Sequence, residues 1–144
     1  MRICIVSSVD VENPYGSTTR PYYISEYLAE FGCEILHFCS NPPKNGKVKY
    51  LPKKQKKRLT LIHTPFDLFN IYKECRKFSP DILYVHQLSN ALRILPSKYL
   101  LKLPMVFDAH GSWVLERFNI SNYYQKKIGS KQERTILNKA DKII

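Results

Sequence analysis

Four residues that could bind or activate a substrate follow one short apolar run in the second half of the chain. The segment 104–113 reads Pro-Met-Val-Phe-Asp-Ala-His-Gly-Ser-Trp, so the apolar run leads directly into Asp108, His110, Gly111 and Ser112. Histidine changes protonation near neutral pH, which suits it to hydrogen bonding and acid–base chemistry. In an open α/β sheet, ligands bind beyond the carboxyl ends of the strands. These residues are therefore site candidates if the chain builds such a sheet.

A second candidate site lies at the end of the polar loop that spans residues 8–18. Gly16, Ser17 and Thr18 precede a predicted helix, and the free amides at a helix amino terminus favour an anion such as a diphosphate. The same residues could instead cap the helix and do nothing more. Arg20 would add positive charge to an anion site, or it could simply lie on the surface.

The segments that must position these residues alternate between strand and helix. Residues 2–7 form a β-branched apolar run typical of a strand buried on both faces. A helix follows and ends at Gly32, and residues 33–39 read as the next strand. This arrangement predicts a βαβ unit with parallel strands. The helix is expected to have Thr18 or Thr19 as its cap, Pro21 in its first turn, and an apolar face made of Tyr23, Tyr27, Leu28 and Phe31.

The rest of the chain continues this alternation. Proline lacks the amide hydrogen and clashes with the preceding helical turn, so Pro96 is expected to break one of the helices. Helices are predicted at residues 65–79, 87–95, 97–102 and 123–139, and strands at 48–51, 59–63, 82–86, 105–109 and 141–144. The order predicts a single doubly wound, Rossmann-like α/β domain with a mainly parallel sheet.

The positive charge of the chain is concentrated in one stretch. The formal net charge is +11, and no acidic residue occurs between Glu34 and Asp67. Such a cluster attracts anionic surfaces, whether phospholipid, nucleic acid or a phosphorylated substrate, but it could equally be a solvated loop. The basic loop 41–60 carries the densest group of cations, Lys53, Lys54, Lys56, Lys57 and Arg58.

Several classes of protein are disfavoured by what the sequence lacks. Its apolar runs are well short of the roughly 20 residues that cross a bilayer, and the amino terminus turns polar too early for a signal peptide, so a cytoplasmic protein is expected. No Gly-x-Gly-x-x-Gly, P-loop or Gly-x-Ser-x-Gly motif occurs, which argues against dinucleotide oxidoreductases, P-loop phosphotransferases and α/β-hydrolases. No metal or cofactor is expected. The cysteines lack the paired spacing of a zinc site and should be small buried thiols: Cys4, Cys33, Cys39 and Cys75.

The order and spacing of these segments resemble the amino-terminal half of the family 4 glycosyltransferases. The likeness begins with Arg-Ile-Cys-Ile-Val-Ser at residues 2–7 and the helix that ends in Glu-Phe-Gly. It continues through Ser-Pro-Asp-Ile-Leu-Tyr-Val-His at 79–86, Val-Phe-Asp-Ala-His-Gly at 106–111, Glu133-Arg134, and Ala-Asp-Lys-Ile-Ile at 140–144. The resemblance implies the GT-B architecture, in which two Rossmann-like domains face each other across a cleft. It also implies transfer of a sugar, of the hexosyl type, from a nucleotide donor with retention at the anomeric carbon.

By this resemblance, residues 1–144 are the acceptor-binding domain, and the carboxyl-terminal domain that holds the nucleotide sugar is not among them. The chain is then not expected to catalyse transfer alone, and its ending on Ile143 and Ile144 suggests one half of a larger protein. The expected partners are a nucleotide sugar held by the second domain, an acceptor that is lipid-linked or phosphorylated, and an anionic membrane contacted peripherally at its inner face.

The resemblance also assigns roles around the strand that ends at Asp108. His110 would hydrogen-bond the transferred sugar or an acceptor hydroxyl, or it would be bonded only to the local backbone. Asp108 would either orient His110 or cap the loop by accepting backbone amides. Gly111 would let a ligand approach the backbone or would simply form a turn, and Ser112 would lie beside it. His86 ends another strand and would either face the same cleft or pack in the core.

The first loop departs from the family pattern. Family members often have a Gly-Gly pair where backbone amides approach the donor diphosphate, and only Gly16 stands here. Residues 8–18 contain no histidine where related inverting enzymes place their base, which favours a retaining mechanism. His37 and His63 are expected to be structural.

A function of another class stays open from the sequence alone. A non-catalytic Rossmann-like module could bind nucleic acid or another anionic partner through the lysine-rich loop. Nucleic acid is the less favoured partner, because no recognisable element for reading it occurs in the chain.

Overall fold

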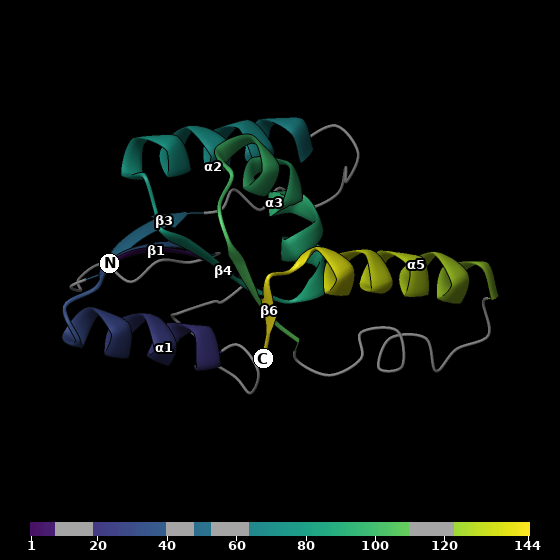
Figure 1. Ribbon diagram of the computed structural model, residues 1–144, viewed down its shortest axis with the longest axis horizontal. Coiled ribbons are helices and arrows are strands. Elements are labelled where there is room, and N and C mark those ends of the chain that lie inside the picture. The colour runs from purple at the N-terminus through teal and green to yellow at the C-terminus, as the bar shows by residue number, and fades with distance from the viewer. Residues whose placement is uncertain (8–18, 40–47, 53–63, 110–122) are drawn as a thin grey trace.

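A computed structural model describes residues 1–7, 19–39, 48–52, 64–109 and 123–144, whose strands form one parallel sheet between layers of helices (Figure 1). The strand order is β3-β2-β1-β4-β5-β6, and each neighbouring pair is parallel. The elements are β1 (Arg2–Val6), α1 (Thr19–Glu30), β2 (Glu34–Cys39), β3 (Lys49–Pro52), α2 (Thr64–Phe78), β4 (Ile82–His86), α3 (Leu88–Leu101), β5 (Met105–Asp108), α5 (Tyr123–Lys139) and β6 (Lys142–Ile143).

This architecture confirms the predicted doubly wound α/β fold. The short strand predicted at residues 48–51 is β3, and the one predicted at 141–144 is β6, which pairs with β5. The strand predicted at 59–63 lies outside the described residues. Because all five strand pairs are parallel, the carboxyl ends of the strands meet at one edge of the sheet, where a doubly wound fold binds its ligands.

Alternation along the strands supplies two apolar faces, one for each helical layer. On one face, Cys4 and Val6 of β1 pack in a cluster that also contains Ile71 of α2, Ile94 of α3 and Ile136 of α5. On the other face, a smaller cluster around Ile3, Ile5, Ile35 and Tyr84 packs against α1, through Ile24, Leu28 and Ala29. Side chains two residues apart in a strand share a face, so this division also decides which polar residues lie under α1.

Helix α1 turns a different side toward the sheet from the one predicted. Tyr23, Tyr27 and Phe31 are exposed, at 54%, 59% and 84%, whereas Pro21 and Ser25 are buried. Pro21 and Ser25 lie on the buried side of the helix, and the half-buried Ile24 and Leu28 pack against the sheet. The predicted apolar face was therefore wrong, apart from Leu28, because it followed the aromatic residues rather than the residues on this buried side.

Helix α3 runs unbroken through Pro96, contrary to the predicted interruption. The exposed Pro96 removes one helical hydrogen bond, but buried residues lie on both sides of it along one helix face. Ala91 and Ile94 before the proline and Ser97 after it all pack inward, and this packing holds the two segments in one helix. The helix ends at Leu101, and Lys102 caps it in a left-handed conformation with φ of 53°.

Two aspartates at the amino edge of the sheet join neighbouring strands. The Asp81 carboxylate accepts a hydrogen bond from the Arg2 amide at 2.7 Å, just before β4 begins. Asp141 stands in the same position before β6: it accepts from the Met105 amide at 2.7 Å and pairs with the Lys98 ammonium at 2.9 Å. The hydrogen bond from the Met105 amide and the interaction with Lys98 hold the pKa of Asp141 below its usual range. Both aspartates belong to segments that carry the family resemblance, and their role is architectural.

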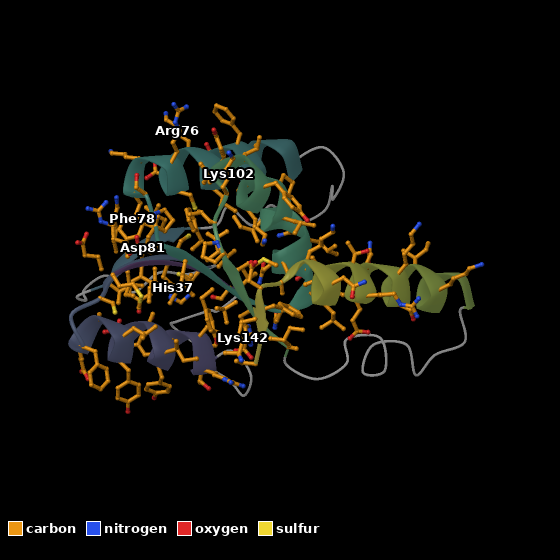
Figure 2. All side chains as sticks on the ribbon, viewed as in Figure 1. His37, Arg76, Phe78, Asp81, Lys102 and Lys142 are labelled. Atoms are coloured by element: carbon orange, nitrogen blue, oxygen red, sulfur yellow. The ribbon has the colours of Figure 1, made fainter. Side chains whose placement is uncertain are left out.

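Figure 2 shows Asp81 beside Phe78, at the edge of the sheet where the chain begins. Arg2 joins the two, because its guanidinium also donates to the Phe78 carbonyl at 3.3 Å. This edge lies opposite the carboxyl ends of the strands, so the two aspartates are remote from the edge where ligands are expected.

Three of the four cysteines are buried, as the sequence predicted, and Cys33 is half-buried. The Cys4 and Cys75 sulfurs lie 3.3 Å apart as free thiols. The hydrogen bond between them and their burial raise the pKa of Cys4. Among the described helices, none combines the length and apolar character that crossing a membrane requires.

Candidate functional site

Polar side chains gather at the carboxyl ends of the three central strands, on the face that α1 covers. Ser7 continues the alternation of Ile3 and Ile5 in β1, and His86 and Asp108 are the last residues of β4 and β5. Val6 is level with Val85 and His86 is level with Asp108, so Ser7, His86 and Asp108 form one row across adjacent strands. All three side chains are buried. The structure thus brings the predicted candidates His86 and Asp108 together.

Asp108 is engaged by two groups that the sequence did not connect with it. Its Oδ2 accepts a hydrogen bond from the Tyr84 hydroxyl at 2.5 Å, and its Oδ1 lies 3.4 Å from Nη1 of Arg20. Burial raises the pKa of the Tyr84 phenol, and the bond to Asp108 raises it further, so Tyr84 remains a hydrogen-bond donor across the physiological range. Within the described residues, Asp108 therefore binds a tyrosine and an arginine, and its predicted roles toward His110 and the loop that follows it lie outside these residues.

Arg20 lies at the amino end of α1, on the same edge of the sheet as Asp108. Its side chain is 47% exposed, whereas that of Asp108 is fully buried. The ion pair partly neutralises the positive charge that the sequence suggested for an anion site. The guanidinium group has five N–H donors, and its exposure leaves part of this set open to solvent or to a ligand.

His37 lies in β2 beside this row, and Figure 2 shows it between the sheet and α1. Its Nε2 is hydrogen-bonded to the Ser7 hydroxyl at 2.8 Å. Burial lowers the pKa of His37 to about 3, and the nearby His86 contributes to this shift. Within the described part of the chain, Nδ1 of His37 has no hydrogen-bond partner. His37 is therefore a neutral buried group at physiological pH, in agreement with the structural role predicted for it.

His86 is 1% exposed, which fits the alternative in which it packs in the core. Its backbone carbonyl accepts a hydrogen bond from the Asn90 side chain at 2.7 Å, and this contact joins the end of β4 to the first turn of α3.

Tyr50 of β3 extends the polar layer toward the edge of the sheet. Its hydroxyl is bonded to the Glu26 carboxylate at 2.5 Å and to the Ser25 hydroxyl at 3.1 Å, and its ring centroid lies 5.3 Å from that of His37. Burial and the bond to Glu26 raise the pKa of Tyr50. Tyr50 and Tyr84 were not among the predicted site residues. The signal that could have identified them is the alternation of side chains along each strand, which places both tyrosines on the same face of the sheet as His37 and Asp108.

The other predicted site residues lie outside the described part of the chain and stay predictions. They are His110, Gly111 and Ser112 after β5, Gly16, Ser17 and Thr18 before α1, and the cations Lys53, Lys54, Lys56, Lys57 and Arg58. Within the described ranges, no three His, Cys, Asp or Glu side chains lie close enough together to hold a metal ion.

Comparison with solved structures shows that this fold recurs in much longer proteins. Sucrose-phosphate synthase from Thermosynechococcus elongatus is similar with a TM-score of 0.78 and 13% identity, covering 99% of this chain and 41% of that protein. HepE from Anabaena, in complex with UDP and glucose, gives a TM-score of 0.71 and 10% identity, and the match covers 99% of this chain and 37% of that protein. The UDP-GlcNAc 2-epimerase from Methanocaldococcus jannaschii gives a TM-score of 0.62 and 17% identity, and the match covers 100% of this chain and 39% of that protein. At these identities the likeness shows the fold alone, and the chain spans about two fifths of the length of these proteins.

Sequence comparison assigns the family. No curated protein matches the chain significantly. The family model described as Glycosyltransferase Family 4 matches residues 15–144, which include α1, the row at the ends of β4 and β5, and the two aspartate segments at the amino edge. The match confirms the resemblance drawn from the sequence, and it covers nearly the whole chain. The chain therefore belongs to glycosyltransferase family 4.

Proposed function

We propose that residues 1–144 are the acceptor-binding, amino-terminal domain of a retaining glycosyltransferase with the GT-B architecture. The observation that carries this proposal is the family match over residues 15–144. Its donor is a nucleotide sugar held by a second domain, and its acceptor is a lipid-linked or phosphorylated molecule. The absence of a histidine in residues 8–18 supports the retaining mechanism.

The residues at the carboxyl edge of the sheet have distinct roles in this proposal. Transfer breaks the bond between the anomeric carbon and a phosphate oxygen of the donor, and it forms a bond to an acceptor hydroxyl oxygen, whose proton is released. Negative charge develops on the departing diphosphate. Arg20 and the amides near Gly16, Ser17 and Thr18 stabilise that charge, and His110 hydrogen-bonds the sugar or the acceptor near Gly111 and Ser112.

The test is sugar transfer by a protein that contains this chain together with a matching carboxyl-terminal domain. Radiolabelled nucleotide sugars are supplied with a membrane-lipid extract and with phosphorylated acceptors, and the labelled product is separated and identified. Transfer is expected with the joined protein and not with the 144-residue chain alone. Failure of the joined, folded protein to transfer sugar from any nucleotide donor to any acceptor would overturn the proposal.

The basic loop motivates a second part of the proposal, peripheral contact with an anionic membrane. Vesicles that contain anionic lipid should bind the protein more tightly than neutral vesicles at low salt, and added salt should weaken the binding. Replacing Lys53, Lys54, Lys56, Lys57 and Arg58 with glutamine should remove this preference. Equal binding to both kinds of vesicle would show that the loop does not serve this purpose.

A further inference from the structure

We infer that Asp108 and Tyr84 are positioning residues that hold Arg20 for contact with an anionic group of the substrate. The inference rests on the proposed function and deepens it, because it names the side chains that act on Arg20. Asp108 ends β5, Tyr84 lies in the adjacent strand β4, and Arg20 is the second residue of α1. The three groups come from separate elements and meet at the carboxyl edge of the sheet.

The geometry gives each group a different part. Tyr84 donates to Oδ2 of the fully buried Asp108 at 2.5 Å, which fixes the orientation of the carboxylate. The other oxygen, Oδ1, lies 3.4 Å from Arg20 Nη1 and has no hydrogen bond within the described residues. An ion pair at this distance without a hydrogen bond restrains the guanidinium group but does not saturate its donors. Among the described residues, Arg20 therefore keeps N–H groups for a ligand.

Restraint of this kind favours binding through entropy. An arginine side chain that is ordered only when the ligand arrives loses rotamer freedom at that moment, at a cost of about 0.5–1.5 kcal/mol. Arg20 is 47% exposed and would be free to change rotamer without the buried carboxylate behind it. Pairing with Asp108 before the ligand arrives removes part of this cost. It also attracts the guanidinium away from the ligand, so the two effects of Asp108 on anion affinity have opposite signs.

The opposite signs make the Asp108→Asn variant decisive. If Asp108 only neutralises Arg20, removing its charge strengthens anion binding. If Asp108 positions Arg20, the same change weakens binding, by about threefold to tenfold, the range that the ordering cost of one side chain allows. Tyr84→Phe removes only the hydroxyl that orients the carboxylate. It should weaken binding in the same direction and less strongly.

The experiment measures binding of inorganic pyrophosphate to the 144-residue chain by NMR titration. The backbone amide resonances of α1 are the reporter in every variant, and the Arg20 side-chain Nε–Hε resonance is a second reporter in the proteins that keep Arg20. Arg20→Ala should weaken binding about tenfold, and Asp108→Asn should have no further effect in the Arg20→Ala background, because it acts through Arg20. Arg20→Lys should restore binding only in part, because lysine lacks the planar fork. Glu34→Gln is the matched control: it removes the exposed ion pair with Arg2 at the opposite edge and should not change the affinity.

Four results would overturn the inference: no binding by the wild-type chain, unchanged binding by Arg20→Ala, tighter binding by Asp108→Asn, or additive effects of the Arg20 and Asp108 replacements. Should Asp108→Asn fail to fold, Tyr84→Phe takes its place in the double-mutant cycle: its effect on pyrophosphate affinity is measured with and without the Arg20→Ala replacement. The inference and the proposed function fail separately. Pyrophosphate binding with the expected coupling but no sugar transfer by the two-domain protein would reject the function alone. Transfer with additive effects of Arg20 and Asp108 would reject the positioning role alone.

Discussion

Replacing His110 with alanine is expected to lower kcat/KM for sugar transfer by about 100-fold in the protein that includes the second domain. In the proposed site, the His110 imidazole hydrogen-bonds the sugar or the acceptor hydroxyl as charge is redistributed in the transition state. Loss of one such donor in an enzyme active site reduces turnover by about 10²–10³. His110 stands two residues after Asp108, which ends β5 at the carboxyl edge of the sheet, where substrates bind in this fold.

Two companion variants separate chemistry from folding in this experiment. His110→Asn keeps a hydrogen-bond donor and should recover part of the lost kcat/KM. His63→Ala removes a histidine that has no proposed contact with substrate, and its kcat/KM should be close to that of the wild type. Urea unfolding midpoints show whether any variant is destabilised. Unchanged turnover by a well-folded His110→Ala protein would remove His110 from the site.

The stability of the folded chain is expected to fall as the solution is acidified from about pH 7.5 to about pH 5, and His37 should account for much of the loss. Its pKa is about 3 in the folded state, where burial disfavours the charged imidazolium, against an ordinary value of 6.5. Between these two pKa values, His37 is therefore protonated in the unfolded chain and neutral in the folded chain. The contribution of His37 to the free energy of unfolding is fully present above pH 6.5, and it declines as the pH falls toward 3. The loss at His37 is about 2 kcal/mol at pH 5.

A matched variant isolates this residue from the other histidines. His37→Gln can still be hydrogen-bonded to the Ser7 hydroxyl, and glutamine does not titrate. Among the described residues, His37 also lies near His86, whose charge would repel an imidazolium, and its ring centroid lies 5.3 Å from that of Tyr50. The free energy of unfolding is measured by urea titration of both proteins at the two pH values. The decline should be smaller in His37→Gln by about 2 kcal/mol; parallel declines would mean that His37 does not control it.

The sheet of this protein follows from local patterns in the chain, and the exceptions show where such patterns fail. The alternation of apolar runs with amphipathic segments predicted the order of the elements, and Gly32 ends α1 with a φ of 82° as its position suggested. The aromatic residues of α1 and of the turn after it misled the prediction, because Tyr23, Tyr27 and Phe31 have apolar rings but lie in solvent. Pro96 misled the prediction because the free-energy cost of a proline inside a helix is smaller than the stabilisation from the packing of residues on both sides of Pro96.

The candidate site was predicted by position and not by contact. Asp108 was identified because it follows a buried run, and the end of a parallel strand in this fold is a place where ligands bind. Its contacts with Tyr84 and Arg20 could not be inferred, because neither residue is near Asp108 in the sequence. His86 was placed in the row by the same argument, and its burial could be known only from what packs over it.

The sequence by itself determined the fold class, the family and the edge of the sheet at which the candidate residues stand. These depend on hydrophobic periodicity, on glycine and on short segments in a set order, all of which are properties of neighbouring residues. Only the tertiary structure decided which side of α1 meets the sheet, that α3 continues through Pro96, and that Asp108 binds Tyr84 and Arg20. These depend on side chains from separate elements sharing one buried space, where packing and desolvation outweigh local preference.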